Sequence, residues 1–151
     1  MPEVGEQAPD FTLPSTSGEV RLSEATERGK VVLAFYYEDA TPICSTEISM
    51  LRDDHDLVRE LGAEVIAVSA DSLDSHEAFA ERLGGITFPL ASDEMLEVAK
   101  AFDVVDESGK RSRRAVFVID RGGTVLYAER WFQPGNPAQY EVIFRALGLE
   151  G

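Results

Sequence analysis

The chain has 151 residues, 44% of them apolar, which predicts one globular domain, residues 1–151, with a hydrophobic core. Its 14 basic and 28 acidic residues give a formal net charge of −14, which argues against nucleic acid and anionic membranes as partners. The longest apolar run, 31–37, is far shorter than the ~20 residues that span a bilayer.

The chain holds a single cysteine, so no internal disulfide is available. Residues 1–6 lack the basic region and the apolar core of a secretory signal. Both observations favour a reducing compartment, and we expect the cytoplasm.

The first 30 residues are predicted to form an opening arm. Residues 11–13 favour a short strand, and 15–18 are typical of a turn. We expect Ser23 to cap a short helix that ends near Gly29.

The next stretch predicts a strand, a helix and a second strand. Residues 31–37 are a continuous apolar run, as in a strand buried on both faces. A helix over 42–61 follows, ended by Gly62, and then a strand over 64–69. This order indicates a parallel βαβ unit, whose functional sites gather at the carboxyl ends of the strands.

The second half continues with alternating helices and strands, bounded by glycine turns and capping residues. We expect a helix that begins within 71–74 and ends near 84–85, with Asp74 and Glu77 at capping-box spacing, and then a loop or short strand over 88–90. A helix over 94–102, capped by Ser92 or Asp93, and a turn at 108–110 should follow. The last expected elements are a hairpin of strands 115–119 and 125–130 around a turn at 121–123, and a helix from Asn136 to Leu147.

The cysteine lies at the start of the helix predicted over 42–61. Thr41 is a favourable N-cap and Pro42 a favourable first helical residue, so Cys44 is the third residue of the helix. The Thr41 hydroxyl should then reach the backbone N–H of Cys44. The N–H groups of Ile43 and Cys44, which can serve as fixed donors, and the helix dipole favour a thiolate.

Spacing places Cys44 on the apolar face of this helix, at the edge of the core. Apolar residues recur at steps of three and four along that face, which comprises Cys44, Ile48, Leu51, His55, Val58 and Leu61. A buried structural cysteine is the alternative interpretation.

The stretch 35–48 resembles the active-site loop of the peroxiredoxins, whose pattern is Pro-x-x-x-Thr-x-x-Cys. Thr41 and Cys44 match this pattern, whereas Tyr37 stands in place of the proline. The resemblance covers nearly the whole chain, and its further segments are 4–13, 88–93, 98–102 and 114–120.

The resemblance implies a thioredoxin-like α/β fold with a central mixed sheet flanked by helices. It also implies a thiol-dependent peroxidase that reduces hydrogen peroxide or organic hydroperoxides and needs no cofactor. With one cysteine, the chain is similar to the one-cysteine type, close to the bacterioferritin-comigratory-protein-like group. A peroxide attacked by the Cys44 thiolate would leave a sulfenic acid on the sulfur.

This chemistry also needs a cation near the sulfur, and no Lys, Arg or His occurs between Val31 and Leu51. The resemblance assigns this role to Arg114, which precedes the strand over 115–119. Arg113 is the alternative, and only one of the two can face Cys44 because neighbours in a strand point to opposite sides. Thr41 would hydrogen-bond near the sulfur or a peroxide oxygen.

Other residues are assigned supporting or purely structural roles. The resemblance implies that Glu47 positions the arginine, with a solvated glutamate as the alternative. Tyr37, Pro42 and Ile43 are expected around the pocket. We interpret His55 as packing and His76 as a solvated first-turn residue, with no metal-ligand spacing at either. Trp131 and Phe132 are interpreted as packing residues, with a place in the pocket or a dimer contact as alternatives.

Some relatives carry a resolving cysteine five residues after the reactive one. Ser49 occupies that position here, so an external thiol must reduce Cys44. That reductant is a thioredoxin-like protein or a low-molecular-weight thiol, and the resemblance suggests a homodimer. Two other hypotheses compete. The first is a thioredoxin-type disulfide reductase, but the chain lacks the Cys-x-x-Cys motif that this chemistry needs. A non-catalytic redox sensor or binding module would explain Tyr37.

Overall fold

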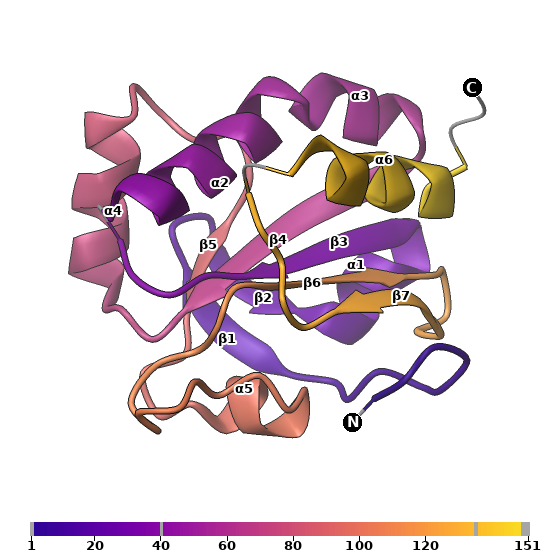
Figure 1. Cartoon of the computed structure of the whole chain (residues 1–151), viewed down its shortest axis with the longest axis horizontal. Helices are drawn as coiled ribbons and strands as arrows, with labels where there is room; N and C mark the ends of the chain where they lie inside the picture. The colour runs from indigo at the N-terminus through magenta and orange to yellow at the C-terminus, as the bar shows by residue number, and fades with distance from the viewer. Residues whose placement is uncertain (1, 40, 135, 149–151) are drawn as a thin grey trace.

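The computed structural model describes residues 2–39, 41–134 and 136–148. In this part of the chain seven strands form one mixed sheet with the order β2-β1-β5-β4-β3-β6-β7, and helices cover both of its faces (Figure 1). The strands are β1 (Thr12–Ser15), β2 (Gly18–Arg21), β3 (Lys30–Phe35), β4 (Ala63–Ser69), β5 (Leu90–Ser92), β6 (Ala115–Ile119) and β7 (Val125–Glu129). The helices are α1 (Leu22–Arg28), α2 (Pro42–Asp53), α3 (His55–Glu60), α4 (Leu73–Arg82), α5 (Glu97–Ala101) and α6 (Pro137–Ala146).

Strand β3 lies in the middle of the sheet and divides the core into two layers. It runs parallel to β4 and antiparallel to β6. Alternate side chains of a strand point to opposite faces, so Val31, Leu33 and Phe35 pack with α1 and α5, whereas Val32, Ala34 and Tyr36 pack with α2, α3, α4 and α6. Cys44 belongs to the second layer.

The predicted βαβ unit is confirmed, but its single helix over 42–61 is wrong. The structure has two helices there, α2 and α3, separated by Asp54 with φ −93° and ψ 4°. Two acidic residues, Asp53 and Asp54, stand at the end of α2, where the helix dipole disfavours negative charge. Gly62, at φ +79°, follows α3 and adopts the left-handed conformation expected of a helix terminator.

Two predicted helix caps are also wrong. Ser23 lies inside α1, and its backbone N–H donates to the Asp10 carboxylate at 2.8 Å. The cap of α4 is Ser72, whose hydroxyl accepts from the N–H of Ser75, because the helix begins two residues earlier than Asp74 and Glu77 suggested.

Elsewhere the predicted elements are found with shifted bounds. The turn predicted over 15–18 is followed by a strand, β2, which sequence reasoning missed. Helix α5 is shorter than 94–102, although Asp93 does accept hydrogen bonds from the N–H groups of Val98 and Ala99. The β6–β7 hairpin and the Asn136 cap of α6 are confirmed. None of the described helices has the length and apolar character to cross a membrane.

Candidate active site

Cys44 lies at the carboxyl end of β3, in the first turn of α2, where sites of parallel sheets gather. The Thr41 hydroxyl accepts a hydrogen bond from the N–H of Cys44 at 3.3 Å, as the capping pattern predicts. The Cys44 side chain has no exposed surface. The sulfur therefore lies next to the positive end of a helix and away from bulk water, which strengthens electrostatic interactions with it.

Arg114 reaches the sulfur from the neighbouring strand. Phe35 of β3 pairs with Ala115 of β6, so the residue before Ala115 stands beside the start of the Cys44 loop. The Nη1 group of Arg114 donates to Cys44 Sγ over 3.9 Å. Arg113 points elsewhere, and its guanidinium lies 3.7 Å from the centre of the Trp131 ring. The structure thus brings Arg114 to Cys44, and Arg113 to an aromatic side chain.

A pocket of about 400 Å³ opens beside this pair. Its basic side is formed by Arg113 and Arg114, and its aromatic side by Tyr37, Trp131 and Phe132. Phe132 is buried, whereas Trp131 is 67% exposed at the rim, so the packing interpretation fits only Phe132. Cys44 itself does not line this pocket, but Arg114 lines it and also contacts the sulfur.

Two expected pocket residues lie outside this pocket. Pro42 is the first residue of α2, as predicted, and Ile43 is 52% exposed. Within the described residues neither of them lines the pocket. A larger hollow of about 720 Å³ lies at the amino ends of β3 and β4, among Gly29, Gly62 and His55. Neither Cys44 nor Arg114 lines that hollow, so its position does not associate it with the thiol.

Glu47 is fully buried one turn after Cys44 on the same helix face. Among the residues that the structure describes, neither oxygen of its carboxylate has a hydrogen-bond partner, so the expected tie to an arginine is not formed in this state. Burial, and to a lesser degree the negative charge at Cys44, raise the pKa of Glu47 well above its usual range, and the positive charge of Arg114 opposes this only in part.

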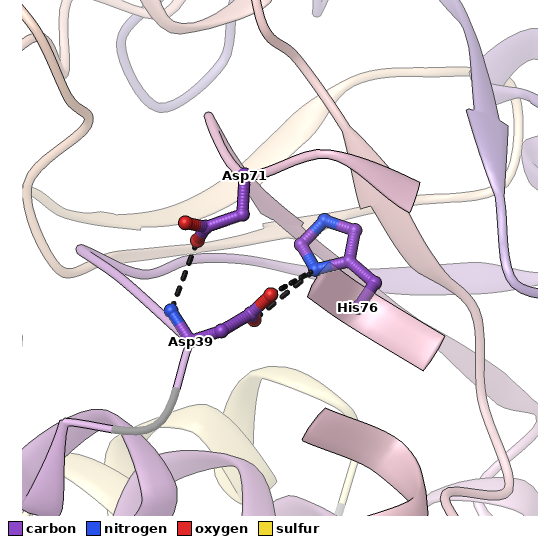
Figure 2. Close-up of side chains that lie close together, drawn as sticks. All are labelled: Asp39, Asp71 and His76. Carbon is purple, nitrogen blue, oxygen red and sulfur yellow. Dashed lines mark hydrogen bonds and ion pairs between the residues drawn. The ribbon is translucent and has the colours of Figure 1, made fainter. Parts of the chain in front are cut away.

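A second polar cluster lies behind the segment that joins β3 to α2 (Figure 2). His76 was predicted to be solvated, and this is wrong: its side chain is fully buried in α4. Its Nδ1 lies 2.9 Å from Oδ2 of Asp39, and the hydroxyl of Tyr36 donates to Oδ1 of Asp39 at 2.7 Å. The sequence did carry a signal, since polar residues follow both β3 and β4 at the same sheet edge.

Hydrogen bonds from three partners set the ionisation of Asp39. Burial by itself would raise the pKa of this carboxyl, but hydrogen bonds from His76, Tyr36 and Ser75 outweigh it and hold the pKa below its usual value. Asp39 therefore stays charged in the folded protein down to lower pH than an exposed aspartate does.

Asp39, Asp71 and His76 are close enough to hold a metal ion, with ligand atoms within 4.8 Å of one another. Each carboxylate oxygen of the two aspartates nevertheless accepts a hydrogen bond from the protein. Arg111 adds a positive charge 3.1 Å from Oδ1 of Asp71. The protein itself thus satisfies the charge and the lone pairs that a cation would need.

Comparisons with known proteins agree with this geometry. A sequence model described as the AhpC/TSA family matches residues 4–128. A 2-cysteine peroxiredoxin of Chattonella marina var. antiqua is 37% identical over 135 residues, which are 83% of this chain and 69% of that protein. A peroxiredoxin of Thermoplasma volcanium is 39% identical over 127 residues, 80% of this chain and 62% of the relative.

Solved structures give the same result. The peroxidoxin BcpB of Mycobacterium tuberculosis superposes with a TM-score of 0.85 at 32% identity and covers 96% of both chains. The reduced 2-Cys peroxiredoxin of Plasmodium vivax superposes with a TM-score of 0.84 at 28% identity, over 95% of this chain and 93% of the other. The predicted thioredoxin-like fold is thereby confirmed.

The chain belongs to the AhpC/TSA family and is a peroxiredoxin, a thiol-dependent peroxidase. Its single cysteine fits the one-cysteine type.

Proposed function

We propose that this peroxiredoxin reduces hydrogen peroxide or organic hydroperoxides through Cys44 in a one-cysteine cycle. One observation carries the proposal: the Arg114 guanidinium lies 3.9 Å from a buried sulfur at a helix N-terminus capped by Thr41. A cation, a fixed N–H group and low solvent access are the conditions that stabilise a reactive thiolate.

The first step is a displacement at oxygen. The Cys44 thiolate supplies the electron pair for a new S–O bond while the O–O bond breaks, and the departing oxygen takes up a proton and leaves as water or an alcohol. Negative charge spreads from the sulfur to both oxygens in the transition state. Arg114 and the first N–H groups of α2 would stabilise this charge, and the Thr41 hydroxyl, which donates to the Glu38 carbonyl at 3.3 Å, would turn from that carbonyl to hydrogen-bond near the sulfur or a peroxide oxygen.

The second step uses an external thiol, because the chain has one cysteine. A thiol attacks the Cys44 sulfenic acid, a mixed disulfide forms and water leaves. A second thiol then attacks this disulfide and releases Cys44. A thioredoxin-like protein or a low-molecular-weight thiol in a reducing cytoplasm would serve as reductant, and we propose a homodimer as the assembly.

The alternative role as a redox sensor or binding module was suggested by Tyr37, which stands in place of the motif proline. This tyrosine lines the pocket together with Arg114, a place that is also compatible with the peroxidase role. No comparison favours the alternative.

The test is the intact mass of the protein after one equivalent of hydrogen peroxide, with and without a sulfenic-acid trap, together with the rate of thiol loss. We expect rapid loss of the thiol and one trappable oxygen on Cys44. Cys44→Ser is the control, because it should consume no peroxide. A thiol that reacts no faster than free cysteine would refute the proposal.

A further inference from the structure

The burial of Cys44 creates a problem for the reductant. Hydrogen peroxide has only two heavy atoms, and Arg114 both lines the pocket and contacts the sulfur. A thiol reductant is bulkier and must bring its own sulfur into line with the S–O bond of a group that has no exposed surface. If the proposed function holds, the segment that carries Cys44 must therefore move in the second half of the cycle.

The four residues that lead from β3 toward Cys44 are each held by a side chain from another part of the fold. The carbonyl of Tyr36 accepts from the Ser112 hydroxyl at 2.8 Å, and that of Tyr37 accepts from Nη1 of Arg111 at 3.3 Å. Nε of the same arginine lies 3.6 Å from the Glu38 carboxylate.

Asp39 is held at both its main chain and its side chain. Its N–H donates to Oδ2 of Asp71 at 2.9 Å, and its carboxylate contacts Nδ1 of His76 (Figure 2). The same carboxylate also accepts from the hydroxyls of Tyr36 and Ser75. Asp39 is thus the point where this segment is tied to α4 and to the end of β4, two residues before the Thr41 cap.

His76 anchors this tie through both of its ring nitrogens. Nδ1 faces the Asp39 carboxylate at 2.9 Å, and Nε2 faces the backbone carbonyl of Ala91 in β5 at 2.9 Å. The Ala91 carbonyl is an acceptor, so Nε2 donates to it, and Nδ1 faces both the Asp39 carboxylate and the Tyr36 hydroxyl, which lies 3.1 Å away. These buried contacts are costly to break, because a buried polar group that loses its partner keeps its full desolvation penalty.

We propose that the buried Asp39–His76 contact is a latch that holds the Cys44 segment closed for the reaction with peroxide and limits how often the segment opens to the reductant. Both are positioning residues, since neither touches the sulfur. The proposal rests on the proposed function for its place in the cycle, but the latch itself is a property of the folded chain.

Population arithmetic separates the effects of the latch on the two half-reactions. The oxidation rate follows the fraction of closed molecules, which stays near one until opening becomes extensive. The reduction rate follows the small open fraction, which grows in direct proportion to the opening constant. A weaker latch therefore accelerates reduction while it leaves oxidation nearly unchanged.

The experiment compares Asp39→Asn and His76→Phe with the parent protein. The chain offers a matched control in its other histidine, His55, which is also buried, lies 2.7 Å through Nδ1 from the Thr87 hydroxyl and packs on Phe88. His55→Phe removes a comparable polar contact far from the latch. The probe is 2-nitro-5-thiobenzoate, a coloured aromatic thiol that converts the sulfenic acid to a mixed disulfide with loss of water.

We expect both latch variants to react with this thiol about tenfold faster or more, as the loss of a charge-assisted hydrogen bond implies, and His55→Phe to leave the rate unchanged. Oxidation by hydrogen peroxide should change by less than about threefold in all three variants. Equal thiol rates in latch variants and control, or a joint fall of both half-reactions, would overturn the proposal.

Two further measurements keep the latch testable in other cases. If a variant is too unstable to assay, hydrogen exchange of the 36–44 segment in Tyr36→Phe, which removes the hydroxyl that contacts both Asp39 and His76, must still rise over the parent protein. If the parent thiol proves no more reactive than free cysteine, the proposed function fails. The rate at which a bulky bromobimane alkylates reduced Cys44 is then measured instead. Both latch variants must again react faster than the parent protein, and His55→Phe must leave the rate unchanged.

Discussion

Glu47 offers the sharpest test of how this site handles charge. Its carboxyl group is fully buried without a hydrogen-bond partner among the described residues, and burial together with the charge at Cys44 raises its pKa well above the usual range. The folded protein therefore holds a proton on Glu47 at pH values where the unfolded chain has released it. Replacement by Gln removes this titration and keeps the shape of the neutral carboxyl.

The sign and size of the effect follow from proton linkage. Between the unfolded pKa of about 4.3 and the raised folded pKa, the native state binds one proton more than the unfolded state. The unfolding free energy of the parent protein must then fall by about 1.4 kcal/mol per pH unit relative to Glu47→Gln. The stability contributed by the proton is complete below the unfolded pKa and is lost as the pH rises through the folded one.

The assay is urea unfolding of both proteins at half-unit steps between about pH 4.5 and pH 8, with the difference in unfolding free energy plotted against pH. Glu60, an exposed residue of α3, supplies the control, and Glu60→Gln should give a flat difference. The experiment is repeated with Cys44→Ser, where the slope should persist because burial is the larger cause. A difference for Glu47→Gln that does not vary with pH would refute the reasoning.

Three further predictions follow from single contacts. Arg114→Ala should slow oxidation of Cys44 by about 10²–10³-fold in stopped flow, as loss of a transition-state donor does, whereas Arg113→Ala keeps most of the rate because that side chain stacks on Trp131. Trp131→Ala should raise the KM for cumene hydroperoxide about three- to tenfold and leave that for hydrogen peroxide unchanged, since only the aromatic substrate can stack at the rim. Gly29→Ala should cost about 1–3 kcal/mol in urea unfolding, because its Cβ would collide with the Gly62 carbonyl oxygen.

Local sequence predicted the start of the Cys44 helix well, because a cap is a local interaction. Thr41 and Pro42 determine the register within four residues, and the hydrogen bond from the Cys44 N–H follows from it. The approach of Arg114 required the pairing of two distant strands. That pairing came from the resemblance, since periodicity alone does not say which strand lies next to which.

The polar cluster behind the Cys44 segment shows where such reasoning fails. His76 is in the first turn of an amphipathic helix, and a histidine in that position is most often solvated. Its burial depends on Asp39, which is 37 residues away, and on the Ala91 carbonyl of a third element. A buried polar residue is recognised only together with its partners, and those partners are distant in sequence.

Charge counting links Glu47 to the reactivity of the sulfur. In the proposed reaction the attacking form of Cys44 is the thiolate, with one negative charge, and Arg114 is the cation that contacts the sulfur. The two charges balance only while Glu47 stays neutral. Tyr140 adds no anion either, because burial, with the carboxyl of Glu47 as a smaller cause, raises the pKa of its hydroxyl. Ionisation of Glu47 would leave two anions and one arginine in a site screened from water, where like charges repel strongly. Oxidation by peroxide should therefore slow on the alkaline side in the parent protein, and Glu47→Gln should keep its rate there.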